Sequence, residues 1–490
     1  MGSTIAALDV IILYIIIFRC FIFLISEILK ILYIIFIKHG FKNFIKNKTI
    51  KFTSIQIFSL IFLVFLVMIA TINIIVDDKS SYESQYSFAL TKLQSNTSNQ
   101  VTLSDSFRKW ITNRKNNGKP IIIISGQGGG SRAGCSMYAS LAKLDTIDYI
   151  KDNILAITTI SGSSNGALFY LASKYLNKFP NNNLESNALN LYNNDYVTKS
   201  MYKMLFTDRY LYQRFIPTKF INRNDNLIDL ESAAFSKTIA NNNLEILKKM
   251  QWSDWYKDDH ATLPIFLPIS YNISLGKPSI SSPYKNDIHS NFDYHSILDS
   301  LKSKNNGIIT ISQSVSLSQM FPFISASATV GGDNYMDGGV YDNFAFESLE
   351  ALYQTANKLR NEIDTSKKII IISVENGKID HEYQSTTSQL QSLISSVTKS
   401  IFHTNPIRHL SNLLSELSSK DTLINLKIYP DIKENPEIKS TNLQDVFKIK
   451  TDKSYVVMSR YLTKSEVDTI IKLTDQRIKT SINRAIFTEK

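Results

Sequence analysis

The chain has 490 residues, a formal net charge of +11 and a pI near 9.2. This positive charge suits anionic lipid headgroups, whereas a nucleic-acid partner is not predicted because no nucleic-acid-binding motif accompanies the charge. Its two cysteines, Cys20 and Cys135, offer no disulfide framework, and no spacing of Cys and His matches a metal site, so we predict no metal and no other cofactor.

Two apolar segments open the chain. Residues 55–76 contain no charged residue and have about the 20-residue length that a transmembrane helix needs. Residues 10–37 are equally apolar but include Arg19, Glu27 and Lys30, charges that can snorkel, pair or face another helix. We therefore predict a membrane helical hairpin over residues 1–77. No short n-region and small-residue cleavage site precede it, so a cleaved signal peptide is not predicted.

Lysines indicate how this hairpin is oriented. Residues 1–10 and the stretch just after Val76 are nearly free of lysine, whereas the connection between the apolar segments holds Lys38, Lys42, Lys46, Lys48 and Lys51. The positive-inside rule places that connection in the cytoplasm, and the rest of the chain outside it. If the first segment only lies on the membrane, this topology changes.

The remainder predicts a polar connector and an α/β domain. Residues 78–118 form the connector, with a short helix near Phe107–Thr112. In residues 119–490, apolar strands alternate with helical stretches, which favours a mainly parallel sheet with helices on both faces. The predicted strands are Ile121–Ser125, Ile154–Ile160, Ile265–Ser270, Ile308–Ile311, Ile369–Val374 and Leu423–Tyr429. The predicted helices are Ala133–Leu144, Ala167–Tyr175 and Ser465–Arg484.

Residues 178–255 are interpreted as an insertion in this domain. Their aromatic residues are typical either of a lid or acyl-chain groove, or simply of core packing, since aromatics dominate buried area. The sequence leaves both interpretations open.

A glycine cluster follows the first predicted strand. Gly128, Gly129 and Gly130 free the backbone N–H groups to point at an anion, and the start of the next helix adds a partial positive charge beside Arg132. A tetrahedral oxyanion is the species that such donors stabilise, typically by about 3 to 4 kcal/mol for one donor. We predict an oxyanion hole formed by these three glycines and Arg132.

A serine motif follows the second predicted strand. Gly162-Ser163-Ser164-Asn165-Gly166 matches GxSxG, in which a serine sits on a tight strand-to-helix turn. Gly162 and Gly166 are predicted to keep side chains away from the exposed hydroxyl. Ser164 is therefore the candidate nucleophile.

A serine nucleophile needs a base, and Asp337 is the best placed candidate. Gly338 and Gly339 follow it directly and predict a turn with close backbone approach. Ser164 and Asp337 would together form the catalytic pair.

In this order and spacing, the three motifs resemble the patatin-like phospholipases, which use a Ser-Asp dyad and a glycine-rich oxyanion loop. The resemblance covers roughly Gly126 to Asn343 and includes Phe321-Pro322-Phe323 and Tyr341-Asp342-Asn343. It implies a patatin-like three-layer α/β sandwich with Ser164 as nucleophile and Asp337 as base. Many members carry glycine directly after the basic residue of the first motif, where this chain has Ala133.

The motifs also partly match a dinucleotide-binding fingerprint and a Ser-Asp-His triad. Gly128 to Ala133 formally satisfies the GxGxxA dinucleotide fingerprint, but the acidic residue expected about 20 positions on is missing, and no GK[ST] follows the glycines. A Ser-Asp-His triad is permitted by chain order, because His381, His403 and His409 follow Asp337. None of these histidines lies in a glycine-marked loop, which disfavours the triad.

The sequence thus predicts a membrane-anchored serine acyl hydrolase of bacterial type, located in the inner membrane with its catalytic domain outside the cytoplasm. It would cleave carboxylic esters of phospholipids through an acyl-Ser164 intermediate, with membrane phospholipids as both substrate and anchor. The alternatives are a lysophospholipase, thioesterase or neutral-lipid esterase on the same dyad, or an inactive membrane-tethered regulatory protein. The sequence identifies no protein partner.

Overall fold

The structure is a computed structural model that describes residues 101–115, 117–196, 198, 223–256, 263–287, 294–303, 307–321, 325, 327–377, 405–429 and 461–482, with the single residues 19, 26 and 30. Nearly all of these belong to one compact unit, Ser87–Tyr196 with Asn224–Lys490. The predicted hairpin therefore lies outside the described residues, apart from those three positions. Among the helices that the structure describes, none is both long and apolar enough to cross a bilayer.

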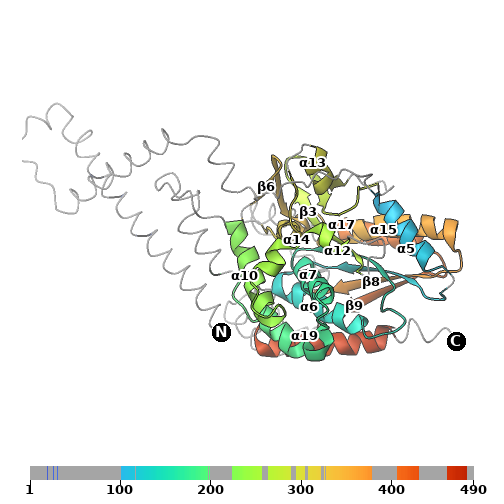
Figure 1. The fold of residues 1–490 in the computed structure, drawn as a ribbon, viewed down its shortest axis with the longest axis horizontal. Helices are drawn as coiled ribbons and strands as arrows, with labels where there is room; N and C mark the ends of the chain where they lie inside the picture. Colours follow the sequence, from blue (N-terminus) through green and yellow to red (C-terminus); the bar gives the residue numbers. More distant parts are fainter. Residues whose placement is uncertain are drawn as a thin grey trace, which may run out of the picture. The chain divides into compact units, whose positions relative to one another are not determined.

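Five parallel strands form the centre of the sheet, in the order β3-β2-β1-β8-β9. Figure 1 labels β3, β8 and β9 of this sheet. Both β1 (Ile121–Gly126) and β8 (Ile369–Glu375) begin with four isoleucines and a serine, and every residue of β1, β2 (Ile154–Ile160) and β8 is buried. Parallel strands covered on both faces need such continuous apolar runs. The sheet is completed by β3 (Ile265–Asn272), β9 (Thr422–Lys427), β4 (Lys277–Ile280), β5 (His295–Ser296), β6 (Ala328–Val330) and β7 (Asp333–Asp337).

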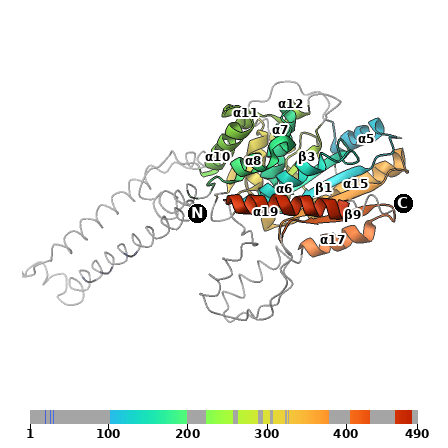
Figure 2. The ribbon, with the colours of Figure 1, turned by 90° about the horizontal axis from the view of Figure 1, so that it is seen from below.

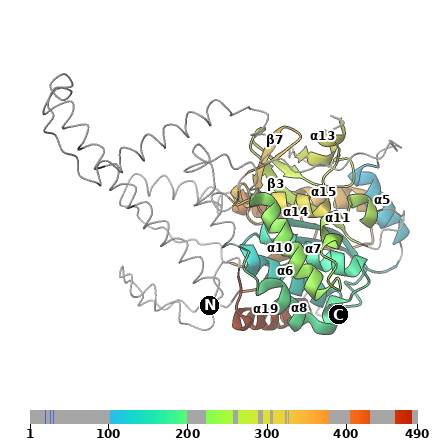
Figure 3. The same cartoon turned by 60° about the vertical axis from the view of Figure 1, so that its left-hand side comes forward.

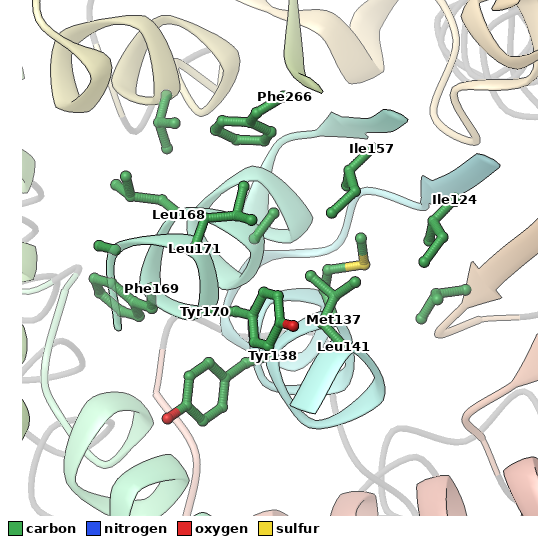
Figure 4. Packing of buried hydrophobic residues seen from close by; sticks show 14 of the residues in the cluster. Ile124, Met137, Tyr138, Leu141, Ile157, Leu168, Phe169, Tyr170, Leu171 and Phe266 are labelled. Carbon is green, nitrogen blue, oxygen red and sulfur yellow. The ribbon is translucent and has the colours of Figure 1, made fainter. Parts of the chain in front are cut away.

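Helices cover both faces of this sheet. Because side chains alternate along a strand, Ile122 and Ile124 face one core cluster while Ile121 and Ile123 face the other. The first face carries α6 (Gly130–Leu144), α7 (Gly162–Tyr175), α8 (Leu184–Tyr192) and α19 (Lys464–Arg477), which runs beside α6 in Figure 2. Figure 4 shows Met137, Leu141 and Tyr170 in this core. The second face carries α5 (Leu103–Asn113), α15 (Phe346–Ile363) and α17 (Asn405–Glu416).

The remaining elements are one long helix, α10 (Arg223–Thr238), and several short ones. The short ones are η2 (Pro180–Asn183), α11 (Glu245–Lys249), α12 (Trp252–Trp255), α13 (Ile297–Ser303), α14 (Ile311–Ser318), η3 (Gly338–Val340) and η5 (Ile478–Ile482). Within the predicted insertion, Phe235, Trp252 and Trp255 are buried in the core of the first face. These aromatics are core residues, while Tyr202 and Tyr210 lie outside the described residues.

Several predicted elements differ from those observed. Ile308–Ile311 is not a strand, because Thr310 caps α14 through a reciprocal capping box with Gln313. In the connector predicted for residues 78–118, α5 is longer than expected, and its Phe107 and Ile111 are buried in the core that α15 shares. The strands β4, β5, β6 and β7 were not predicted.

A buried cluster of titratable groups joins α15 to α17. His409 Nδ1 lies 2.9 Å from Glu350 Oε2, and its Nε2 lies 3.8 Å from Glu347 Oε2. Burial raises the pKa of Glu347 to about 8 and that of Glu350 to about 7. The pKa of His409 is lowered to about 4, mainly by burial and secondly by the positive charge of Arg408. The Asp342 carboxylate adds to the increase at Glu347. All three side chains are thus neutral near pH 6.

We expect this cluster to make stability fall as the pH rises above neutral. A glutamate with a raised pKa in the folded state stabilises fully below its ordinary value of 4.5, and that contribution is lost as the pH rises through about 8 for Glu347. The lowered pKa of His409 changes stability with pH only between about pH 4 and pH 6.5. Between pH 6.5 and 8, urea unfolding should therefore show a smaller loss of stability for Glu347→Gln than for the wild type. Glu362→Gln, at an exposed position of α15, should lose stability with rising pH as steeply as the wild type. An equal dependence of stability on pH in all three proteins would contradict the raised pKa of Glu347.

Candidate active site

Strand β3 brings Asp337 to the end of β2. The first part of β3 pairs with β2 as far as Ile269 opposite Ile160, and its continuation pairs with β7 from Ser270 opposite Asp337. Because β4 occupies the other edge of β3 over these same residues, β7 must lie on the edge that β2 uses. Figure 3 shows β7 beside β3. The register thus places Asp337 just beyond the last residue of β2.

The residue that follows β2 is Ser161. Its backbone has φ 56° and ψ −129°, and α7 begins at the next residue, Gly162. Such a conformation costs a non-glycine residue about 1 to 3 kcal/mol and is found mainly at functional sites. A sharp, strained strand-to-helix turn is the geometry that exposes a nucleophilic serine at the top of a sheet. The turn predicted at Ser164 therefore lies at Ser161.

Ser164 lies in the first turn of α7, fully buried. Its hydroxyl accepts a hydrogen bond from Thr159 Oγ1 at 2.9 Å and lies 2.9 Å from Ser318 Oγ. The same Ser318 oxygen accepts a hydrogen bond from the Ser161 backbone N–H at 3.0 Å. Ser318 thus connects Ser164 to the turn at Ser161.

The glycines of the GxSxG motif have a different task from the predicted one. A Cβ on Gly162 would lie 1.8 Å from the carbonyl oxygen of Gly130, and a Cβ on Gly166 would lie 2.2 Å from that of Gly134. Both positions need glycine because α6 and α7 pack backbone against backbone. This close packing brings the glycine loop before α6 up to the Ser161 turn.

The glycine loop lies directly against Ser161. A Cβ on Gly128 would be 3.2 Å from Ser161 Cβ and 2.3 Å from Asn343 Oδ1. The N–H of Gly128 donates to the carbonyl oxygen of Asn343 at 2.9 Å, so it is engaged within the fold. Gly129 and Gly130 have φ values of 147° and 62° at the start of α6. Within the described part of the chain, their N–H groups make no hydrogen bond.

Arg132 points to another loop than the one predicted. Its Nε donates to Asn376 Oδ1 at 3.2 Å, and its Nη2 lies close to Gly377 in the segment after β8. Arg132 therefore contacts the glycine loop through Asn376. The Ala133 departure is accommodated within α6, where this residue is buried.

Asp337 is buried, and the turn after it is built around its carboxylate. Asp337 Oδ1 accepts a hydrogen bond from the Gly339 N–H at 2.8 Å, and the Asp337 N–H donates to the carbonyl oxygen of Met320 at 3.0 Å. A Cβ on Gly338 would lie 2.5 Å from the carbonyl oxygen of Ile269, so this glycine permits the approach of the turn to β3. A Cβ on Gly339 would lie 3.6 Å from Ile160 Cγ2, at the end of β2.

Three residues of this region were not predicted from the sequence: Ser161, Ser318 and Asn376. For Ser161 a signal existed, because it is the first residue after the buried strand Ile154–Ile160, where a strand-to-helix turn must begin. Ser318 and Asn376 come from distant segments and carry no local pattern that marks them, whereas Asn343 lies in the Tyr341-Asp342-Asn343 motif that the resemblance includes.

Of the three histidines that chain order permits in a triad, the structure describes only His409. His409 is buried between α15 and α17 and contacts Glu350, while His381 and His403 lie outside the described residues. The described residues contain no group of three or more His, Cys, Asp or Glu side chains that could hold a metal ion.

Comparisons with known proteins give only distant similarity. No protein-family model matches the chain, and no curated protein matches it. Among solved structures, the crystal structure of VipD from Legionella pneumophila matches with 12% identity and a TM-score of 0.29, over 73% of this chain and 67% of that one. Human GIVD cytosolic phospholipase A2 matches with 8% identity and a TM-score of 0.34, over 77% of this chain and 64% of that one. This chain thus spans less than two thirds of the human protein.

Ser318 offers a test of the contacts below the turn. In Ser318→Ala the buried N–H of Ser161 would lose its acceptor, and we expect the free energy of unfolding to fall by about 1 to 3 kcal/mol. Ser316→Ala is the matched control, because Ser316 Oγ is buried in the same helix and makes no hydrogen bond within the described residues. Urea unfolding of both variants measures the difference. Equal stabilities would mean that Ser318 does not support the turn.

Proposed function

We propose that this chain is a serine acyl hydrolase in which Ser161 is the nucleophile and Asp337 the base. The observation that carries this proposal is the register of β3, which brings Asp337 to the residue that follows β2. The strained turn at Ser161 supports its choice over Ser164, whose hydroxyl contacts two other hydroxyl groups. Ser164 remains the alternative nucleophile.

In this mechanism Asp337 accepts the proton of the Ser161 hydroxyl as the serine oxygen attacks the carbonyl carbon of an ester. The C–O bond to the leaving alcohol then breaks, the alcohol takes the proton, and an acyl-serine remains. Asp337 next takes a proton from water as the water oxygen attacks the acyl carbon. The bond between the acyl carbon and Ser161 Oγ then breaks, the proton passes from Asp337 to Ser161 Oγ, and the carboxylic acid leaves. The Asp337–Gly339 hydrogen bond orients the carboxylate for both steps.

The charge of the tetrahedral intermediate would be stabilised by the N–H groups of Gly129 and Gly130. Support comes from the contact of the glycine loop with Ser161 and from the start of α6, whose partial positive charge favours an anion. The N–H of Gly128 is excluded from this proposal because Asn343 already accepts it.

We propose phospholipid acyl esters as the substrate class. The uncharged segment 55–76 and the net charge of +11 support a protein that works at an anionic lipid surface. The resemblance of the three motifs to the patatin-like phospholipases supports the same class. Lysophospholipids, thioesters and neutral-lipid esters are chemically compatible with the same dyad.

Release of free fatty acid from mixed phospholipid vesicles tests the activity, and labelling by a fluorophosphonate probe identifies the nucleophile. We expect the label on Ser161, and we expect Ser161→Ala and Asp337→Asn to lose activity by a factor of about 10⁴ or more. Ser164→Ala should retain most activity, and Ser316→Ala serves as a control for a buried hydroxyl of α14.

Each other result has a definite meaning. A label on Ser164, with activity lost only in Ser164→Ala, would make Ser164 the nucleophile. A wild-type protein that neither hydrolyses the vesicles nor takes the label would favour the non-catalytic regulatory alternative.

Membrane anchoring by residues 1–77 is part of the proposal. Replacing Leu66 by Arg places a charge near the middle of the uncharged segment, at a cost of about 2.5 to 3.5 kcal/mol for insertion. We expect the wild-type chain to stay with membranes after an alkaline wash and Leu66→Arg to be partly extracted. The control is Lys109→Arg on the exposed surface of α5, which should stay with membranes as the wild type does. Leu103→Arg is unsuitable as a control because Leu103 is buried and the change would disrupt the folded core. Complete extraction of the wild type would refute the anchor.

A further inference from the structure

Two loops beyond the ends of β1 and β8 hold each other by their amide side chains. The strands are parallel neighbours with Gly126 opposite Val374, so Gln127 and Asn376 follow them at the same edge of the sheet. Gln127 Oε1 accepts hydrogen bonds from the N–H groups of Asn376 at 2.7 Å and Gly377 at 3.0 Å. In return, Asn376 Nδ2 donates to the carbonyl oxygens of Gln127 at 3.0 Å and Gly128 at 3.1 Å.

The orientation of the Asn376 amide is defined by its neighbours. Its Nδ2 faces two carbonyl acceptors, and its Oδ1 faces the Nε donor of Arg132. A flipped amide would oppose acceptor to acceptor and donor to donor. A Cβ on Gly129 would lie 2.5 Å from Asn376 Oδ1, so the glycine loop fits closely around this side chain.

The hydrogen bond to Gly128 has a consequence for the next N–H group. The carbonyl of Gly128 and the N–H of Gly129 belong to one peptide unit, and no peptide bond among the described residues is cis. In a trans peptide the C=O and N–H point in opposite directions. Because Asn376 holds the Gly128 carbonyl toward itself, the Gly129 N–H points away from Asn376.

We propose that Asn376 is a positioning residue that fixes the Gly128–Gly129 peptide plane and thereby aims the Gly129 N–H at the oxyanion. This inference rests on the proposed acyl-hydrolase function. Asn376 touches neither the nucleophile nor the substrate, and it acts through the loop. The neighbouring peptide is held on both sides, since the Gln127 carbonyl accepts from Asn376 and the Gly128 N–H donates to Asn343.

The variant that tests this role is Asn376→Asp in the full-length chain. It keeps an acceptor for Arg132 but replaces the donor of both loop hydrogen bonds by an acceptor. Asn376→Leu makes the same test without adding a charge, should the aspartate fail to fold. Asn153→Asp is the matched control, because Asn153 is also buried and its Nδ2 donates to the Lys151 carbonyl at 2.9 Å, before β2 at the opposite end of the sheet.

We expect Asn376→Asp to lower kcat and the rate of fluorophosphonate labelling by about 100-fold, as the loss of one oxyanion donor does. KM should change by less than about 3-fold, because substrate binding does not depend on this N–H group. Hydrogen exchange at the Gly128 amide should become faster. Asn153→Asp should lose stability and keep both kcat and the exchange rate at Gly128.

Failure of this inference and failure of the proposed function give different results. If the wild type is active and Asn376→Asp labels as fast as the wild type, or changes KM alone, the positioning role is refuted and the function stands. If the wild type is inactive and takes no label, the proposed function is refuted. Exchange at Gly128 then still decides whether Asn376 fixes the loop, and unchanged exchange refutes it.

Discussion

The candidate site depends on one strand that has two partners along the same edge. β3 pairs with β2 through Ile269 and with β7 from Ser270 onward. The last residue of β2 and the last residue of β7 are therefore neighbours. Backbone hydrogen bonds fix this meeting to within one residue, because a slip of one position would turn every side chain to the opposite face. The proposed nucleophile and base are therefore positioned by strand register, which is more rigid than a loop.

Close backbone packing brings the third component to the same point. Gly162 and Gly166 on α7 face the carbonyl oxygens of Gly130 and Gly134 on α6, and any side chain there would separate the helices. The helices start from the loops that follow β1 and β2, so their contact also sets the distance between the glycine loop and Ser161. Both glycines of the GxSxG motif thus act in helix packing.

Polar groups then hold the loops in place. The Ser318 hydroxyl of α14 supports the Ser161 turn. The main-chain carbonyl of Asn343 and the side chain of Asn376 support the glycine loop. In a buried site each such hydrogen bond is strengthened by the low dielectric, and each missing partner would be costly. The proposed catalytic geometry and the stability of the fold therefore depend on the same hydrogen bonds. For this reason Ser318 is compared with Ser316, whose hydroxyl makes no hydrogen bond among the described residues, and Asn376 with Asn153, which lies at the other end of the sheet.

By itself the sequence determined the parallel core, because the isoleucine runs of β1 and β8 suit only strands buried on both faces. It also predicted the glycine loop and Asp337, whose local patterns are distinctive. It misplaced the turn at Ser164, since a GxSxG match takes no account of where β2 ends. It also missed the pairing of β7 with β3 and the hydrogen bonds of Asn376, whose partners lie more than 60 residues away in the chain. Only the tertiary structure decided these, because strand register and side-chain hydrogen bonds between distant segments leave no periodic trace in a single sequence.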